Sequence, residues 1–119
     1  MKKTEKICPV EHSVNILGGK WKLPIIYALV SNGTVRFKEL ERLVAGITPK
    51  MLTTQLRSLE ANGLVGRKVY PTIPPTVEYF LTDIGKSIKP MIAELEKWGL
   101  YHQEMHLKPK KKRLKKQCN

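Results

Sequence analysis

Cysteine is scarce in this chain, which has only Cys8 and Cys118, one near each end. Two cysteines placed in this way do not make the disulfide framework of a small secreted domain, and they fit a reducing compartment. Long apolar runs are also missing, because no stretch approaches the roughly 20 residues that span a bilayer. Residues 1–6 lead into no signal-peptide hydrophobic stretch. We therefore expect a cytoplasmic protein with no membrane partner.

Residues typical of catalytic and metal sites are sparse as well. The histidines His12, His102 and His106 are scattered, and the sequence has neither a nucleophile motif nor a glycine-rich phosphate loop. Cys8 lies four residues before His12, and His102 lies four before His106, but a pair of ligands with no second pair is a weak zinc signal. The sequence therefore predicts no enzyme activity, no cofactor and no metal site.

Acidic residues are few, and the imbalance of charge points to a polyanionic partner. The chain has 22 Lys and Arg against 10 Asp and Glu, a formal net charge of +12. Seven of the basic residues lie in segment 108–119, which leaves 15 basic and 10 acidic residues, or +5, for the rest. Such a field attracts DNA, RNA or an anionic membrane surface. We expect one folded domain over 1–107 and a basic disordered tail over 108–119. The tail either adds non-specific affinity for a polyanion or serves solubility alone.

Helical periodicity covers most of residues 10–62. A short helix is expected over 10–16, and a second one follows Gly18 and Gly19 and ends near Gly33. A third helix is expected over 37–44. The fourth has Thr48 as its N-cap and Pro49 in its first turn, and it runs to residue 61 or 62. Only residues 46–48 join the last two helices, so they pack as a helix-turn-helix.

Two β-prone segments, 65–70 and 77–81, surround a proline-rich stretch and predict a two-stranded hairpin. After the hairpin, Thr82 is expected to cap one long helix, with a bend at Pro90. The fold class is therefore α+β and mainly helical. Apolar residues on the long helix follow the helical period and offer a surface for dimerisation, and they are Ile88, Met91, Ile92, Leu95, Trp98 and Tyr101.

The helix that follows Thr48 has two opposed faces. Leu52, Leu56 and Leu59 form one stripe, whereas cationic and hydroxyl side chains, with no acid among them, lie opposite. Such donors bind base edges and phosphates, and the basic hairpin follows directly. The predicted DNA contacts are Thr48, Pro49, Lys50, Thr53, Thr54, Arg57, Arg67, Lys68, Thr72 and Thr76. The alternatives are a solvated helix face and a hairpin that only covers the core.

Seven motifs resemble the HxlR family of winged helix-turn-helix regulators, which are MarR-like. They are CPVE at 8–11, LGGKWK at 17–22, RFKEL at 36–40, ITPKMLT at 47–53, GLV at 63–65, VEY at 77–79 and LTDIG at 81–85. The likeness covers residues 8–101. It implies a homodimer joined through its terminal helices, with the hairpin as a β-wing and the helix after Thr48 in the major groove. Two-fold symmetry places the two reading helices about 34 Å apart on a near-palindromic operator.

Several members of this family sense oxidants or electrophiles through a cysteine near the N-terminus, and Cys8 stands at the matching position. A thiol just before a helix start has the setting of a reactive thiolate. Packing as a small hydrophobe beside the dimer contact is the alternative, and the residues favour it slightly. Cys118 is either a resolving partner or without a role. The inducer, whether an oxidant or a small molecule, and the sign of regulation stay open.

Two other functions fit parts of the pattern. A winged-helix module can bind a protein partner through the apolar face of its last helix, and salt dependence separates that function from phosphate binding. An RNA-binding domain lacks support because no exposed aromatic platform is evident in the hairpin. Trp21, Trp98 and Tyr101 either pack in the core or line a ligand crevice between dimer halves, and the packing role is favoured.

Overall fold

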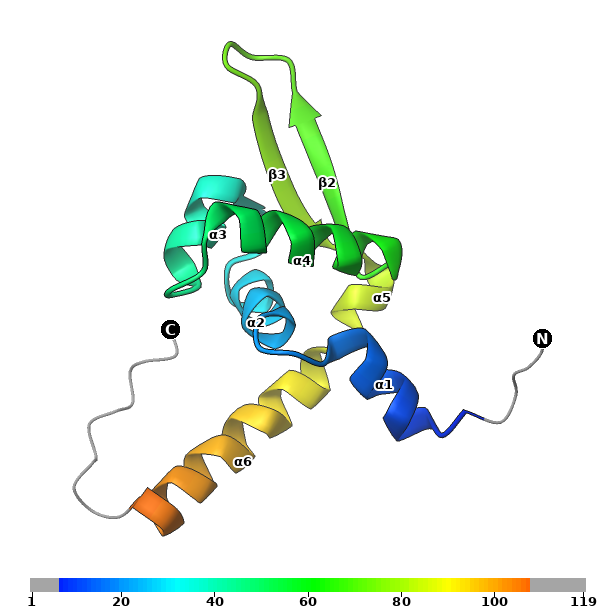
Figure 1. Cartoon of the computed structure of the whole chain (residues 1–119), viewed down its shortest axis with the longest axis vertical. Coiled ribbons are helices and arrows are strands. Elements are labelled where there is room, and N and C mark those ends of the chain that lie inside the picture. Colours follow the sequence, from blue (N-terminus) through cyan, green and yellow to red (C-terminus); the bar gives the residue numbers. More distant parts are fainter. Residues whose placement is uncertain (1–6, 108–119) are drawn as a thin grey trace.

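A computed structural model describes residues 7–107 of the chain, and the basic tail expected over 108–119 lies outside this part (Figure 1). Its elements run in order α1 (Pro9–Leu17), α2 (Lys22–Asn32), β1 (Val35–Arg36), α3 (Phe37–Leu43), α4 (Pro49–Ala61), β2 (Val65–Tyr70), β3 (Thr76–Leu81), α5 (Asp83–Lys86) and α6 (Lys89–Leu107). The predicted helix-turn-helix is confirmed as α3 and α4. Among these residues no helix is long and apolar enough to cross a membrane.

Helix α4 begins and ends where its sequence predicts. The Thr48 side chain accepts a hydrogen bond from the Met51 N–H at 3.1 Å, which satisfies one of the free amides of the first turn. After Ala61 the chain turns away through Gly63, whose positive φ of 80° suits a residue without Cβ. The helix therefore has a fixed start, length and exit.

The inner face of α4 consists of three leucines that are almost completely buried. Leu52 and Leu59 are 0% exposed and Leu56 is 1% exposed. They pack in one core with side chains from α2, α3 and the sheet, including Ile25, Leu40 and others that are likewise buried. Because these leucines recur at i, i+4 and i+7, burying all of them fixes the rotation of α4 about its own axis. The opposite face must therefore point to solvent.

The sheet has three strands, one more than the sequence predicts. Its order is β1-β3-β2, with both pairs antiparallel. The hairpin of β2 and β3 is confirmed and projects beyond the helices as the β-wing (Figure 1). β1 consists of Val35 and Arg36 only, which pair with Tyr79 and Glu78. Two residues are too few to show an alternating pattern, and the pairing joins positions far apart in the sequence.

The prediction of one long helix after Thr82 is wrong, because the chain forms α5 and α6 with a turn at Ser87 and Ile88. Thr82 does act as an N-cap, accepting from the Gly85 N–H at 3.0 Å, but it caps the short α5. In one continuous helix the ring of Pro90 would clash with the carbonyl of Lys86, four residues earlier. In α6, Pro90 lies instead at the second position, where its missing N–H costs no hydrogen bond.

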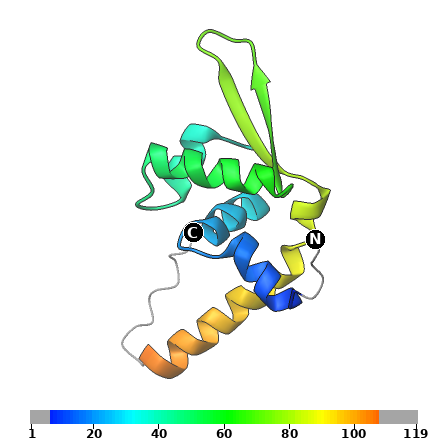
Figure 2. The same cartoon turned by 45° about the vertical axis from the view of Figure 1, so that its right-hand side comes forward.

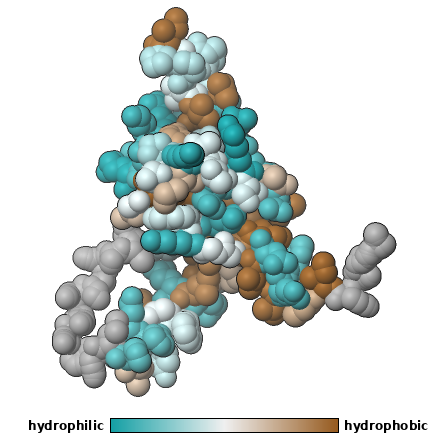
Figure 3. Space-filling view, viewed as in Figure 1, coloured by the Kyte–Doolittle hydropathy of each residue, from teal (hydrophilic) through white to brown (hydrophobic). Residues whose placement is uncertain are grey.

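Helices α1 and α6 lie on the side of the molecule opposite the wing (Figure 2). Both expose several large apolar side chains. The hydropathy view shows brown, apolar atoms over α1 and also at the wing tip (Figure 3). On α1 the exposed residues are Val10 and Val14, and on α6 they are Met91, Leu95, Trp98, Leu100, Tyr101 and Met105. Exposed apolar side chains therefore lie on α1 as well as on α6.

The buried stripe of α4 generates a prediction about stability. Replacing Leu56 by Ala removes buried atoms and leaves a cavity, so we expect the free energy of unfolding to fall by about 2–5 kcal/mol. Thr54→Ala, on the exposed side of the same helix, is expected to change it by less than about 0.5 kcal/mol. Urea unfolding followed by circular dichroism measures both values. Equal losses in the two variants would contradict the packing described for α4.

Candidate nucleic-acid interface

The exposed face of α4 carries the predicted donors. Lys50, Thr54 and Arg57 are exposed and Thr53 is partly exposed, all on the side opposite the three leucines. Neither Lys50 nor Arg57 has an ion pair with any residue among 7–107. Two cations and two hydroxyls therefore stand together with their donors available, on a helix that cannot rotate.

The start of α4 is exposed too, but its two predicted contacts differ in what they offer. The Thr48 hydroxyl oxygen is occupied as a helix cap, although its proton stays available to an acceptor. Pro49 has no N–H to donate, so it contributes only shape. The free amides of the first turn give this end of the helix a partial positive charge, which favours an anion nearby.

Arg67 fastens the wing to α4. Its Nε lies 3.4 Å from Oε2 of Glu60, and its side chain is 55% exposed. Arg67 also lies opposite Tyr79 on the neighbouring strand, and the pKa of Tyr79 is raised above its usual value chiefly by burial and also by the Glu60 carboxylate. The sequence predicts Arg67 as a DNA contact. The structure adds a second role, because Arg67 holds the base of the wing against α4. Its partner Glu60 could not be predicted, since nothing in the sequence marks this residue as a contact of the hairpin.

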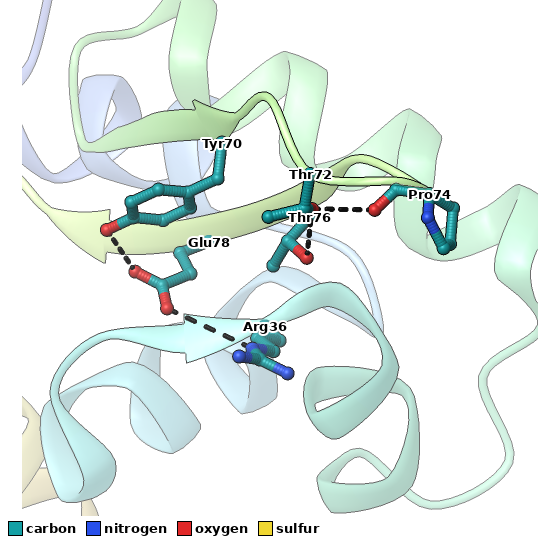
Figure 4. Close-up of polar contacts among 6 residues, drawn as sticks. All are labelled: Arg36, Tyr70, Thr72, Pro74, Thr76 and Glu78. Atoms are coloured by element: carbon teal, nitrogen blue, oxygen red, sulfur yellow. Dashed lines mark hydrogen bonds and ion pairs between the residues drawn. The ribbon is translucent and has the colours of Figure 1, made fainter.

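Lys68 lies on the opposite face of the wing from Arg67, because successive strand residues alternate in direction. Its Nζ lies 5.4 Å from the ring centroid of Tyr70. The Tyr70 hydroxyl donates to Glu78 Oε1 at 3.0 Å, and the other carboxylate oxygen lies 4.0 Å from Arg36 Nε (Figure 4). On this face Glu78 thus contacts Tyr70 and Arg36, and Lys68 lies over the Tyr70 ring.

Arg36 and Lys38 are exposed cations that the sequence did not assign to the site. Arg36 is the N-cap residue of α3, and Lys38 lies in the first turn of that helix. The Arg36 side chain remains 67% exposed beside Glu78. Arg36 lies beside the wing because β1 pairs with β3, and a sequence pattern does not reveal that pairing.

The two threonines predicted at the wing tip use their hydroxyl protons within the tip. Thr72 Oγ1 donates to the carbonyl of Pro74 at 2.6 Å and lies 3.1 Å from Thr76 Oγ1 (Figure 4). Since a hydroxyl has a single proton, Thr76 is the donor of that second bond. Phosphate oxygens only accept hydrogen bonds, so neither threonine donates to DNA while the tip keeps this arrangement.

Cys8 is exposed and occupies the N-cap position of α1. The backbone amides of Glu11 and Val10, in the first turn of the helix, lower the pKa of the thiol below the usual value. Burial as a small hydrophobe is therefore not found within the single chain. The thiol is accessible and has the helix-start setting that stabilises a thiolate. Cys118 lies outside the described residues.

The six predicted dimerisation residues divide into two groups. Ile92 is 5% exposed and Ile88 packs against the same core, so both contribute to the chain's own interior. The other four, Met91, Leu95, Trp98 and Tyr101, are between 38% and 62% exposed. Trp98 stacks on His102, which in turn stacks on His106, so both histidines lie in ring contacts along α6. Trp21 packs against the core, as the favoured alternative expects. The same expectation is wrong for Trp98 and Tyr101, which are 62% and 59% exposed because α6 extends away from the core.

Comparisons with known proteins agree with this geometry. The model of the HxlR-like helix-turn-helix family matches residues 16–107. The chain is 48% identical over 95 residues to an HTH-type transcriptional regulator of Halalkalibacterium halodurans, which covers 80% of this chain and 84% of the relative. Among solved structures, the reduced form of the redox regulator HypR is 42% identical with a TM-score of 0.77, covering 82% of this chain and 96% of that one. The reduced transcriptional regulator YodB of B. subtilis is 34% identical with a TM-score of 0.70, covering 87% and 99%.

Proposed function

This chain belongs to the HxlR-like helix-turn-helix family of transcriptional regulators, and from that premise we propose that it binds a near-palindromic operator in double-stranded DNA as a homodimer. Helix α4 enters the major groove, and the wing reaches the DNA beside it. The observation that carries the proposal is the exposed face of α4, where Lys50 and Arg57 have no acidic partner among the described residues. Cations that serve only solubility do not require a helix face of fixed orientation. Here the buried leucine stripe fixes the rotation of α4, and with it the side on which Lys50 and Arg57 lie.

Selection from a pool of random duplex DNA tests the proposal. We expect the full chain to enrich a near-palindrome whose half-sites lie about one helical turn apart. Arg57→Ala is expected to weaken binding to that duplex and to lower the slope of log K against log salt by about 0.9 for each phosphate that the variant no longer neutralises. Lys97→Ala is the matched control, because Lys97 is an exposed cation on α6, paired with Glu94 and remote from α4.

The outcomes of this experiment separate DNA binding from the alternatives. If the chain retains DNA without enriching a sequence, and if high salt abolishes this binding equally in both variants, the binding is due to general positive charge such as that of segment 108–119. Equal binding by wild type and Arg57→Ala would remove α4 from the interface. Absence of DNA binding would favour a module that docks a protein through the apolar surface of α6.

The dimer rests on the apolar stripe of α6. At 100° per residue, Met91, Leu95, Trp98, Tyr101 and Met105 fall within about a third of the helix circumference. All five are exposed in the single chain, and Val10 and Val14 on α1 are exposed apolar side chains as well. Exposed apolar side chains gathered on one helix face in this way are typical of an interface. Burying it against a second copy also adds stability that a small core lacks.

Two leucines on the same helix test the dimer. Leu95 is 42% exposed within the stripe, whereas Leu100 is 47% exposed and lies about 140° away around the helix. We expect Leu95→Glu to convert the protein to a monomer, because a carboxylate in an apolar interface is costly. Leu100→Glu should stay dimeric. Light scattering after size exclusion gives the masses, and a dimeric Leu95→Glu protein would exclude this face as the interface.

We further propose that oxidation of Cys8 changes the affinity for DNA. The thiolate attacks an oxidant such as hydrogen peroxide and becomes a sulfenic acid, with release of hydroxide; a second thiol then condenses with it to a disulfide and releases water. The lowered pKa and full access of the sulfur support this step. HypR, which the chain resembles, is a redox regulator by its name.

The redox proposal predicts a loss of response in one variant. Cys8→Ser should bind the selected duplex as the reduced wild type does and should not respond to peroxide, whereas Cys118→Ser should respond wholly or in part. Because the pKa of Cys8 is lowered, its thiolate persists at a lower pH than that of a free cysteine. The rate of oxidation should therefore fall, as pH is lowered, only below the range of a free thiol. An unchanged peroxide response in Cys8→Ser would refute the role of this thiol.

A further inference from the structure

The wing tip presents one large apolar side chain to solvent. Ile73 is 99% exposed, the highest value of any large hydrophobic residue among 7–107. Segment 71–76 contains no charged residue, and three of its six residues are prolines. The tip therefore differs from the rest of the candidate interface, where cations and hydroxyls dominate.

The tip is held in shape by hydrogen bonds that leave no free hydroxyl proton. Thr72 donates to the Pro74 carbonyl and Thr76 donates to Thr72 (Figure 4). The Thr72 N–H also donates to the Tyr70 carbonyl at 2.8 Å. Below the tip, Tyr70 and Glu78 link the two strands of the wing, and the Arg36–Glu78 pair joins the wing to β1. A projection ordered in this way loses little conformational entropy when it binds.

Cations leave both faces of the wing below the tip. Arg67 lies on the face toward α4, while Lys68 and Arg36 lie on the other face. The minor groove of DNA is bordered by two phosphate backbones and is only about 6 Å wide. An uncharged tip with cations on either side matches this arrangement, because the phosphates lie to the sides and the groove between them presents sugars and base edges.

We propose that Ile73 enters the minor groove as an apolar wedge and favours base steps that open easily. This inference rests on the proposed DNA binding. It assigns to Ile73 a preference among DNA sequences that the tip threonines do not provide, because their hydroxyl protons are used within the tip. Apolar side chains in the minor groove act by partly unstacking a step, and pyrimidine–purine steps such as TA unstack most readily. The wedge neutralises no phosphate, so its contribution does not depend on salt.

The test uses the full-length chain and two versions of the selected duplex. They differ only in the step under the wing, which is TA in one and AA in the other, so the minor-groove acceptors stay the same while the stiffness changes. Wild type is expected to prefer the TA duplex. Ile73→Ala should bind it roughly 10-fold more weakly, with an unchanged salt slope, and should lose the preference. Ile84→Ala is the matched control, because Ile84 is an exposed isoleucine on α5, at the far end of β3.

Each outcome decides the proposal. If Ile73→Ala binds both duplexes as wild type does while Arg57→Ala loses affinity, the wedge is wrong and the DNA-binding function stands. If neither variant loses affinity, both the wedge and the proposed interface fail. A change of oligomeric mass in Ile73→Ala, measured by light scattering, would make the tip a protein contact and overturn the proposal. Weaker binding with equal preference for TA would likewise overturn it.

Discussion

The burial of Leu52, Leu56 and Leu59 is the constraint on which the rest of the molecule depends. Three leucines along one stripe leave α4 a single rotation in which all of them avoid water. That rotation turns Lys50 and Arg57 outward and places Glu60 near the hairpin. The packing of the apolar core thus determines which way the polar face of α4 points. A change in that packing would move all the candidate DNA contacts on α4 together.

The wing depends on the same constraint through polar contacts. Glu60 on α4 holds Arg67 at the base of the hairpin, while Glu78 lies between Arg36 and Tyr70 on the other face. The cation of each ion pair is more than half exposed, and pairs open to solvent contribute little to stability. Their effect is on the direction of the wing, because the Glu60–Arg67 pair holds it against α4 and the Arg36–Glu78 pair holds it against β1. Recognition would suffer from their loss more than folding would.

Local features of the sequence are sufficient to predict α4 and the hairpin. Thr48 and Pro49 mark a helix start, and the leucine spacing marks its inner face, with no information from distant residues. Strand β1 and the role of Glu78 are not predictable in this way, because both depend on pairs far apart in the chain. The turn before α6 is not predicted either, because a proline at position 90 is compatible with a bend inside a helix as well as with the helix start that the structure has. Burial of Ile92 likewise follows from tertiary packing, not from helical spacing.

Methylation interference on the selected duplex tests the central claim most directly, since dimethyl sulfate modifies guanine N7 in the major groove and adenine N3 in the minor groove. The proposed dimer predicts two clusters of interfering guanines about one helical turn apart, from the α4 of each protomer, with interfering adenines beside each cluster under the wings. Interference confined to the minor groove, or a single unpaired cluster, would contradict a dimer that reads the major groove with α4.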